Sequence, residues 1–223
     1  MMEGGAYGGG KAGGAFDPLA FIQRPQVILR ALCWLFSIVV FGCISSQGWQ
    51  IKDNKEVCLY NEDAMACKYG TTIGVIGFLA SMAFIVGEYL FEQMSSVKSR
   101  KHYVLADLGF SAFWAFKFFI VFVYLWSQWS SSTPPPSGYG VSNVQAAIAF
   151  SFFSIFTWAG CAFFAWKRYK IGAEAAFAST FESDPGVNQY PNYPMENETD
   201  QYSQAPFTAQ QQVDPSDYQP PTY

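Results

Sequence analysis

The chain has 223 residues, of which 51% are hydrophobic, 19% aromatic and only 13% charged. The apolar residues lie in four blocks separated by Gly-, Gln-, Pro- and Ser-rich segments, which excludes a soluble domain and predicts a membrane protein with four spans. The formal net charge of −4 combines an acidic tail, −8 over residues 171–223, with a body of +4, and this division argues against nucleic-acid binding.

The segment 1–26 is rich in glycine and contains no apolar run, so it is predicted to be a disordered arm. No ordinary cleavable signal peptide is expected, because the first apolar run starts too far from the beginning of the chain. The less favoured alternative is a signal sequence with Arg24 and Arg30 as its charged region. The first predicted span is 27–48, and Arg30 near its start is expected to extend its long side chain to the membrane interface.

The second predicted span, 70–91, follows a polar loop at 50–69. Four small residues recur along this span at spacings of four, three and four, which places them on one helical face that Glu88 continues. They are Gly70, Gly74, Gly77 and Ser81. Small residues let membrane helices approach one another closely, so the row is predicted to be a helix-packing face. The alternative is that glycine is simply frequent in membrane helices.

The third predicted span, 103–126, contains ten aromatic residues and two charges, Asp107 and Lys117. A proline-rich loop separates it from the fourth predicted span, 146–166. The remainder, 171–223, is poor in aliphatic residues and rich in Gln, Pro and acids, so it is predicted to be a disordered tail. Its tyrosines are candidates for partner binding or phosphorylation: Tyr190, Tyr193, Tyr202, Tyr218 and Tyr223.

Basic residues flank the spans unequally and predict the orientation. Nine Lys or Arg lie on the side of the two termini and of the loop between the second and third spans, against three on the other side, so both termini are predicted to be cytosolic. Cys58 and Cys67 then share an oxidising lumenal loop, and a disulfide between them is predicted, with two free thiols as the alternative. The cysteines within the spans are expected to act as small apolar residues, with acylation of Cys33 or Cys161 left open.

Charged residues inside the spans are candidate functional groups. Glu88 and Asp107 lie toward the cytosolic side, at a depth similar to that of Arg30 and Lys167, which predicts a polar cluster that fixes helix partners. The alternative is an ion or proton path. Lys117 lies well inside the apolar core without an evident carboxylate at its depth, so it is expected to face the bundle or to extend toward the lumen.

The sequence offers little for catalysis. Its one histidine, His102, stands beside Lys101 in a predicted juxtamembrane loop, where an interfacial polar residue is expected rather than a general base. The sequence contains no phosphate-binding loop, no paired metal ligands and no nucleophile motif. We therefore predict a protein that is not an enzyme and that needs no cofactor.

Several segments resemble the synaptogyrin family. They are the start MEGGAYGGGKAGGAFDP, the strings SSVKSRK, DLGFSAFWAF and AAIAFSFFSIFTWAG, the first loop with CKYG, and the end YQPPTY. The resemblance covers essentially the whole chain and implies a four-helix MARVEL-like membrane domain, here 27–170, in small secretory vesicles and in the synaptic vesicles of neurons. The chain departs from the family pattern in its Lys- and Asp-rich first loop and at Lys117, which is typical of a divergent or invertebrate member.

Family members have no known catalysis and are linked to vesicle biogenesis, regulated exocytosis and membrane recycling. The resemblance therefore implies a non-enzymatic vesicle membrane protein whose partners are lipids, other vesicle membrane proteins and, through the tail, cytosolic trafficking or endocytic adaptors. A homo- or hetero-oligomer is compatible with this role. The alternative is a small channel or transporter subunit that uses Glu88, Asp107 and Lys117.

Overall fold

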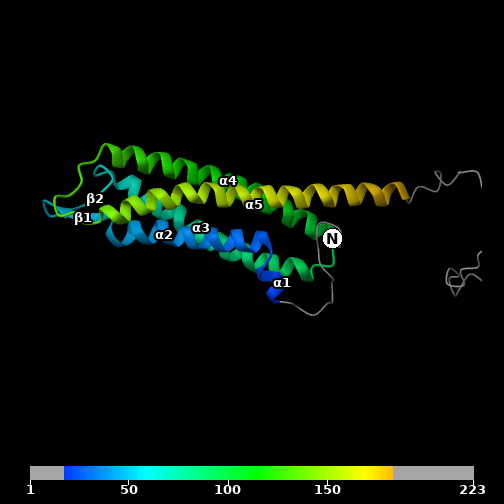
Figure 1. Ribbon diagram of the computed structural model, residues 1–223. Coiled ribbons are helices and arrows are strands. Elements are labelled where there is room, and N and C mark those ends of the chain that lie inside the picture. The colour runs from blue at the N-terminus through cyan, green and yellow to red at the C-terminus, as the bar shows by residue number, and fades with distance from the viewer. Residues whose placement is uncertain (1–17, 183–223) are drawn as a thin grey trace, which may run out of the picture. The chain divides into compact units, whose positions relative to one another are not determined.

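A computed structural model describes residues 18–182, and within this range the chain is mostly helical. Four long helices run side by side as an elongated bundle with a small β-hairpin at one end (Figure 1). Each of the four is long and apolar enough to span a membrane, which confirms the predicted four-helix membrane fold. The elements in order are α1 Pro18–Ile22, α2 Pro25–Gln47, β1 Trp49–Lys52, β2 Lys55–Cys58, α3 Ala64–Gln93, α4 Val97–Ser130 and α5 Val141–Glu182.

The two ends of the bundle are distinct. We call the end that carries β1 and β2 the hairpin end, and the end where α2 starts and α3 turns into α4 the terminal end. Helix α2 packs against α3 and α5, and α4 packs closely against α5 but only sparsely against α3. The helices therefore form a ring in which α2 and α4 lie on one diagonal and α3 and α5 on the other.

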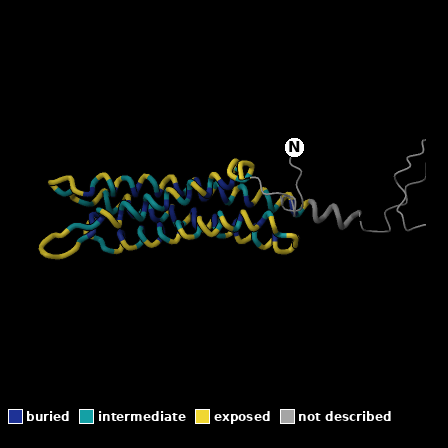
Figure 2. Tube along the Cα trace, turned by 90° about the horizontal axis from the view of Figure 1, so that it is seen from below, coloured by how far each residue is buried: buried dark blue, intermediate teal, exposed yellow. Residues whose placement is uncertain are grey.

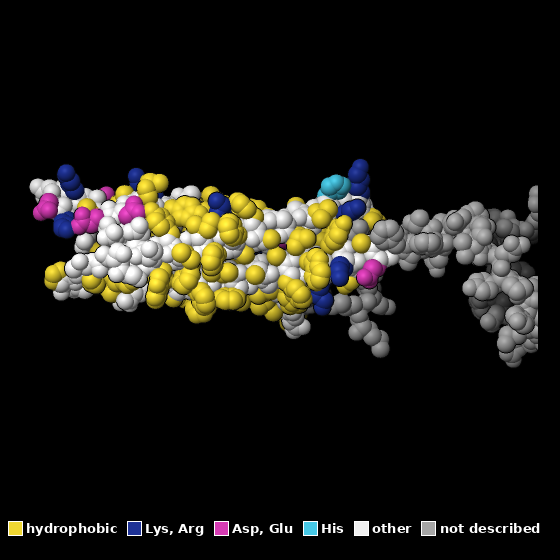
Figure 3. Space-filling model, turned by 90° about the horizontal axis from the view of Figure 1, so that it is seen from above, with side chains coloured by type: hydrophobic (Ala, Val, Ile, Leu, Met, Phe, Trp, Pro, Cys, Tyr) yellow, Lys and Arg dark blue, Asp and Glu magenta, His cyan; other side chains and the backbone are white. Residues whose placement is uncertain are grey.

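Buried residues line the inside of this ring along its whole length (Figure 2). The outward faces are also apolar, because Phe113, Phe116 and Phe119 of α4 are each about half exposed. Most charged side chains on the visible surface gather at the two ends, and the apolar band between them is interrupted by a basic side chain (Figure 3). Helices that are apolar on all sides and carry their charges at the ends are suited to a lipid environment.

The segment predicted as a polar loop at 50–69 contains ordered structure that the sequence analysis missed. Strands β1 and β2 pair antiparallel, and the turn between them places Asp53 and Asn54 at φ values of 50° and 60°. Both residue types tolerate this left-handed conformation, which a two-residue hairpin turn requires. The sequence did contain a signal for this hairpin: the turn-forming pair Asp53-Asn54 lies between two short segments that each include apolar residues.

The helices extend beyond the predicted spans. Residues 18–22 of the predicted arm form α1, and residues 171–182 of the predicted tail continue α5. The sequence after Ile171 is rich in Ala and contains no proline before Pro185, so nothing interrupts a helix there. The chain divides into the units 1–183 and 184–223, and the five tail tyrosines lie in the second unit, outside the described residues.

Candidate functional site: a buried polar cluster

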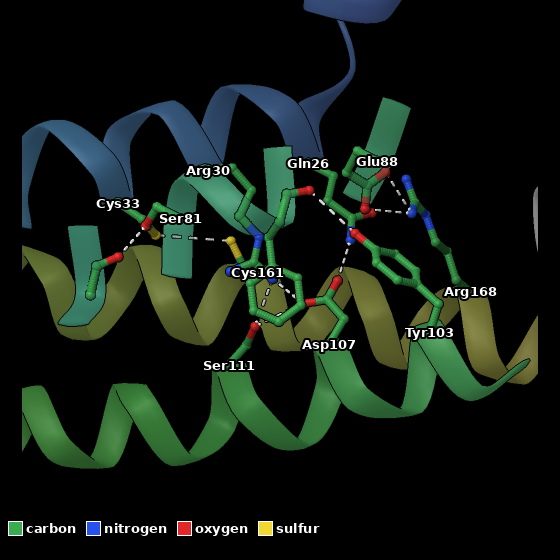
Figure 4. A network of polar contacts seen from close by, with 12 residues as sticks. Gln26, Arg30, Cys33, Ser81, Glu88, Tyr103, Asp107, Ser111, Cys161 and Arg168 are labelled. Carbon is green, nitrogen blue, oxygen red and sulfur yellow. Dashed lines mark hydrogen bonds and ion pairs between the residues drawn. The ribbon is translucent and has the colours of Figure 1, made fainter. Parts of the chain in front are cut away.

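A carboxylate on α4, Asp107, is the centre of a polar cluster inside the terminal half of the bundle (Figure 4). It accepts hydrogen bonds from Gln26 Nε2 at 2.9 Å, from Ser111 Oγ at 2.9 Å and from Nη2 of Arg30. The Arg30 side chain is fully buried, and its Nη2 also donates to Ser111 Oγ at 2.8 Å. The prediction that Arg30 extends to the interface is therefore wrong, because a carboxylate inside the bundle holds it there.

Two aromatic rings complete the surroundings of Arg30. Its Cζ atom lies 4.2 Å from the ring centroid of Phe84 on α3 and 5.1 Å from that of Trp158 on α5. Such contacts between a guanidinium and aromatic faces stabilise a desolvated cation. The Nε and Nη1 atoms of Arg30 have no hydrogen-bond partner among the described residues. The buried charge thus depends on Asp107 and the two rings.

A second ion pair lies near the first. Arg168 on α5 donates from Nη1 to both carboxylate oxygens of Glu88 on α3, at 2.9 and 2.8 Å. The Glu88 side chain is fully buried, and the Arg168 guanidinium also lies 5.4 Å from the ring of Phe91. The sequence analysis named Lys167 for this depth, but Lys167 is exposed, since neighbouring helical residues point about 100° apart.

Both ion pairs cross the diagonals of the bundle. Arg30 and Asp107 join α2 to α4, and Glu88 and Arg168 join α3 to α5, so each pair links helices that are not packed neighbours. A buried charge that loses its partner lowers the stability of the fold, so the ion pair opposes any movement of either helix along its axis or any rotation about it. Together the two pairs connect all four helices across the inside of the bundle.

Tyr103 on α4 covers the cluster on its terminal side. Its hydroxyl donates to the backbone oxygen of Phe84 at 3.2 Å, and its ring contacts the rings of Phe84 and Phe91. The ring fits because residue 87 is glycine: a Cβ there would lie 2.7 Å from the Tyr103 ring. The sequence analysis missed Gln26, Ser111, Arg168 and Tyr103, although Ser111 follows Asp107 at the helical spacing of four.

The row of small residues lies on the buried face of α3. A Cβ at Gly74 would approach Phe41 of α2 to 2.9 Å, and one at Gly77 would approach both Ser37 of α2 and Trp114 of α4 to 2.9 Å. Gly70 faces Ile44 of α2 in the same way, and Ser81 is fully buried. The row thus lets α3 lie close to both of these helices.

The predicted disulfide between Cys58 and Cys67 is present and joins the end of β2 to the first turns of α3, with the two Cα atoms 6.1 Å apart. In contrast, the Sγ atoms of Cys33 and Cys161 lie 4.0 Å apart inside the bundle, and both residues are fully buried. Neither thiol is open to acylation in the folded protein.

Polar contacts fix the hairpin end to the helices. The hydroxyl of the buried Tyr60 donates to the backbone oxygen of Val144 on α5 at 2.9 Å, and burial raises the pKa of this hydroxyl. Asp63 caps α3 by accepting from the backbone N–H of Met65 at 2.9 Å. The hydroxyl of Tyr124 on α4 also donates to Asp63, which lowers the pKa of the Asp63 carboxyl.

Two predicted polar residues lie apart from the cluster. Lys117 is partly exposed on the outer side of α4, with its Nζ atom 5.2 Å from the ring centroid of Phe113. His102 is exposed at the terminal end, where Nδ1 lies 2.7 Å from the backbone oxygen of Lys98. Within the described residues no three His, Cys, Asp or Glu side chains are grouped to hold a metal ion. The charged side chains of the cluster are thus paired with one another.

Comparison with known proteins places this geometry in context. Residues 21–164 match the family model of the membrane-associating domain MARVEL. The chain is 62% identical to "Synaptogyrin" of Drosophila melanogaster over 232 aligned residues, which cover 100% of this chain and 96% of that protein. It is 52% identical to human "Synaptogyrin-1" over 188 residues, 82% of this chain and 81% of that protein. It is 41% identical to human "Synaptogyrin-2" over 225 residues, which cover 100% of both chains.

Proposed function

We propose a function from the premise that the chain belongs to the synaptogyrin family of MARVEL-domain proteins and is a multi-pass vesicle membrane protein. Its bundle has a structural, non-enzymatic role in small secretory or synaptic vesicles. In this role the protein acts in vesicle biogenesis, regulated exocytosis and membrane recycling. The bundle supplies a fixed shape within the bilayer, and the acidic tail of 171–223 recruits cytosolic trafficking or endocytic adaptors.

The observation that carries the structural role is the pairing of both buried acids across the diagonals. Glu88 and Asp107 each hold an arginine, and a group fixed in such a pair stabilises one arrangement of helices. The alternative role as a channel or transporter subunit needs polar groups that follow one another through the membrane. Lys117, which would have to extend such a path, is partly exposed on the outer side of α4, while the two acids face the inside of the bundle.

The orientation forms part of the proposal. Exposed bases gather at the terminal end, at Lys98, Lys101, Lys167 and Lys170, which supports a cytosolic position for this end. The hairpin end, with its disulfide, then faces the oxidising lumen. The sequon that begins at Asn197 would be cytosolic and is expected to carry no glycan in cells. A glycan found there by mass spectrometry would reverse the orientation.

The division of labour between bundle and tail is tested by truncation. The chain should be cut after Glu182, because α5 continues to this residue. The truncated protein should insert and fold like the full-length chain, but we expect its share in small vesicles to fall and its share at the cell surface to rise in a secretory cell. A chain in which the tail acids are replaced by their amides is the matched control for charge. If the truncated chain is retrieved from the surface at the full-length rate, the tail does not recruit the sorting machinery.

A further inference from the structure

Lys117 is a charge in the middle of the apolar band. It lies 14 residues from Tyr103 and nine residues from Trp126, the ends of the apolar segment of α4, or about 21 and 14 Å at 1.5 Å per residue, which is about 4 Å from the midpoint of that segment. With an apolar core of roughly 30 Å, this position is close to the bilayer midplane. Its neighbours Phe113 and Phe116 are 52% and 58% exposed, so the surface around it meets lipid or another membrane protein.

The Lys117 side chain has no charged partner among the described residues of its own bundle. No carboxylate of the described residues forms an ion pair with it, and Asp107 and Glu88 already hold arginines. Helical side chains lean toward the N-terminus of their helix, and the Nζ atom accordingly lies by Phe113, one turn closer to the terminal end. The ammonium therefore points away from the hairpin end, although that end of α4 is the nearer one. Extension to that interface is opposed by the direction of the side chain.

The face of α4 on which Lys117 lies is set by its neighbours two turns away. Seven residues before it, Phe110 contacts Phe84 of α3, and seven residues after it, Tyr124 contacts Tyr69 of α3. Residues seven apart share a helical face, so Lys117 lies on the flank of α4 that faces α3. This is the sparsely packed pair of neighbours in the ring, and we call the line between these two helices the α3–α4 seam.

We propose that Lys117 is the docking point for a transmembrane helix of a different membrane protein, one that carries a carboxylate near mid-membrane and lies along the α3–α4 seam. An isolated ammonium at this depth is unfavourable, and a carboxylate of opposite charge on a second helix would neutralise it. A second copy of this chain fits poorly, since Glu88 and Asp107 in its described spans are buried and paired. The other acids of these spans, Glu92 and Glu174, lie near the ends of their spans at the terminal end, away from the depth of Lys117. Lipid phosphates lie at the interface, about 15 Å from the midplane.

This partner site rests on the proposed role of the bundle as an interacting membrane component, and it is testable without vesicle sorting. Full-length protein labelled with a donor dye is reconstituted in phosphatidylcholine vesicles together with acceptor-labelled synthetic Leu/Ala helices that carry one central Glu, Gln or Leu. Energy transfer at pH 8 reports association. The Glu helix should bind the natural chain roughly tenfold more tightly than the Leu helix.

Two variants give the test its specificity. Lys117→Leu should abolish the preference for the Glu helix, whereas Lys117→Arg should retain it. As a matched control, Leu79→Lys in the Lys117→Leu background restores a lysine on an outward face of α3, at a site that is 56% exposed. If this control again binds the Glu helix more tightly than the Leu helix, the α3–α4 seam is not the specific binding site. Equal binding of the Glu and Leu helices by the natural chain would overturn the carboxylate partner, and unchanged binding by Lys117→Leu would overturn the role of Lys117.

Discussion

The replacement Asp107→Asn tests the diagonal ion pairs most sharply, because it removes one charge while it preserves the shape of the side chain. In the native protein Asp107 accepts three hydrogen bonds, and the fully buried Arg30 has no other carboxylate. After the replacement, the guanidinium stays inside the bundle without a counter-charge. Its Nε and Nη1 atoms have no hydrogen-bond partner in the described structure that could compensate. We therefore expect the variant to be strongly destabilised.

The size of the effect follows from the burial of the pair. Removal of one partner from a buried ion pair typically costs about 3–5 kcal/mol of the free energy of unfolding. For a chain of 150–250 residues, 1 kcal/mol shifts the midpoint of thermal unfolding by roughly 2–4 °C, so a decrease of about 6–20 °C is expected. The midpoint can be followed in detergent through the fluorescence of the protein's seven tryptophans.

Two controls make the result interpretable. Ser111→Ala removes a hydroxyl that donates to Asp107 and accepts from Arg30 but leaves both charges in place, so it should lower the free energy of unfolding by about 1.5–3 kcal/mol, less than Asp107→Asn. The double replacement Arg30→Met with Asp107→Leu removes both charges and should recover most of the lost stability, because an apolar pair can fill such a site. If Asp107→Asn unfolds within 2 °C of the native protein, or if the double variant is no better than the single one, the ion pair does not hold α2 to α4.

Three further predictions concern other parts of the bundle. Gly77→Leu should destabilise the protein by about 1–3 kcal/mol in the same thermal assay, because α2 and α4 leave no room for a side chain at this position. Leu79→Ile on the outward face of α3 should be nearly neutral. Equal effects of the two replacements would show that the row of small residues on α3 does not pack against other helices. Replacement of Cys58 and Cys67 together by Ser should cost about 3 kcal/mol for the ten-residue loop they close, and alkylation of both thiols without prior reduction in native protein would refute the bond. Asp63→Ala should cost about 1 kcal/mol through the lost helix cap. Because the pKa of Asp63 is lowered in the folded state, the stability that its carboxylate contributes is complete above pH 3.8, the ordinary pKa, and is lost as the pH falls through the lower pKa of the folded protein. If the stability difference between the natural chain and Asp63→Ala instead grows on acidification, this sign is wrong.

The sequence carries enough information to predict the four spans, the disulfide and the polar character of the terminal half of the bundle. It does not identify the ion-pair partners, because these spans are apolar on every side and their patterns do not show which face points inward. Lys167 and Arg168 are equally basic neighbours, and only the rotation of α5 decides that Arg168 meets Glu88. Arg30 was interpreted as interfacial because its partner Asp107 lies 77 positions away in the sequence.

Local signals explain the remaining differences. The Asp53-Asn54 turn was readable, but each strand of the hairpin has only four residues, too few for a clear alternation of apolar and polar side chains. The continuation of α5 to Glu182 follows from good helix formers that a hydropathy pattern ignores. The position of Lys117 on the flank of α4 that faces α3 required the contacts of Phe110 and Tyr124 with α3, which only the folded bundle reveals.

The structural role of the bundle is tested most directly by ion and proton flux through purified full-length protein in liposomes. Each internal acid is held by an arginine on the opposite helix, so the account predicts flux no greater than in protein-free liposomes, both for the natural chain and for Lys117→Leu. Correct insertion is verified in the same sample by protease access to the tail. A flux that requires the protein and is abolished by Lys117→Leu would contradict the structural role and would favour a channel or transporter subunit.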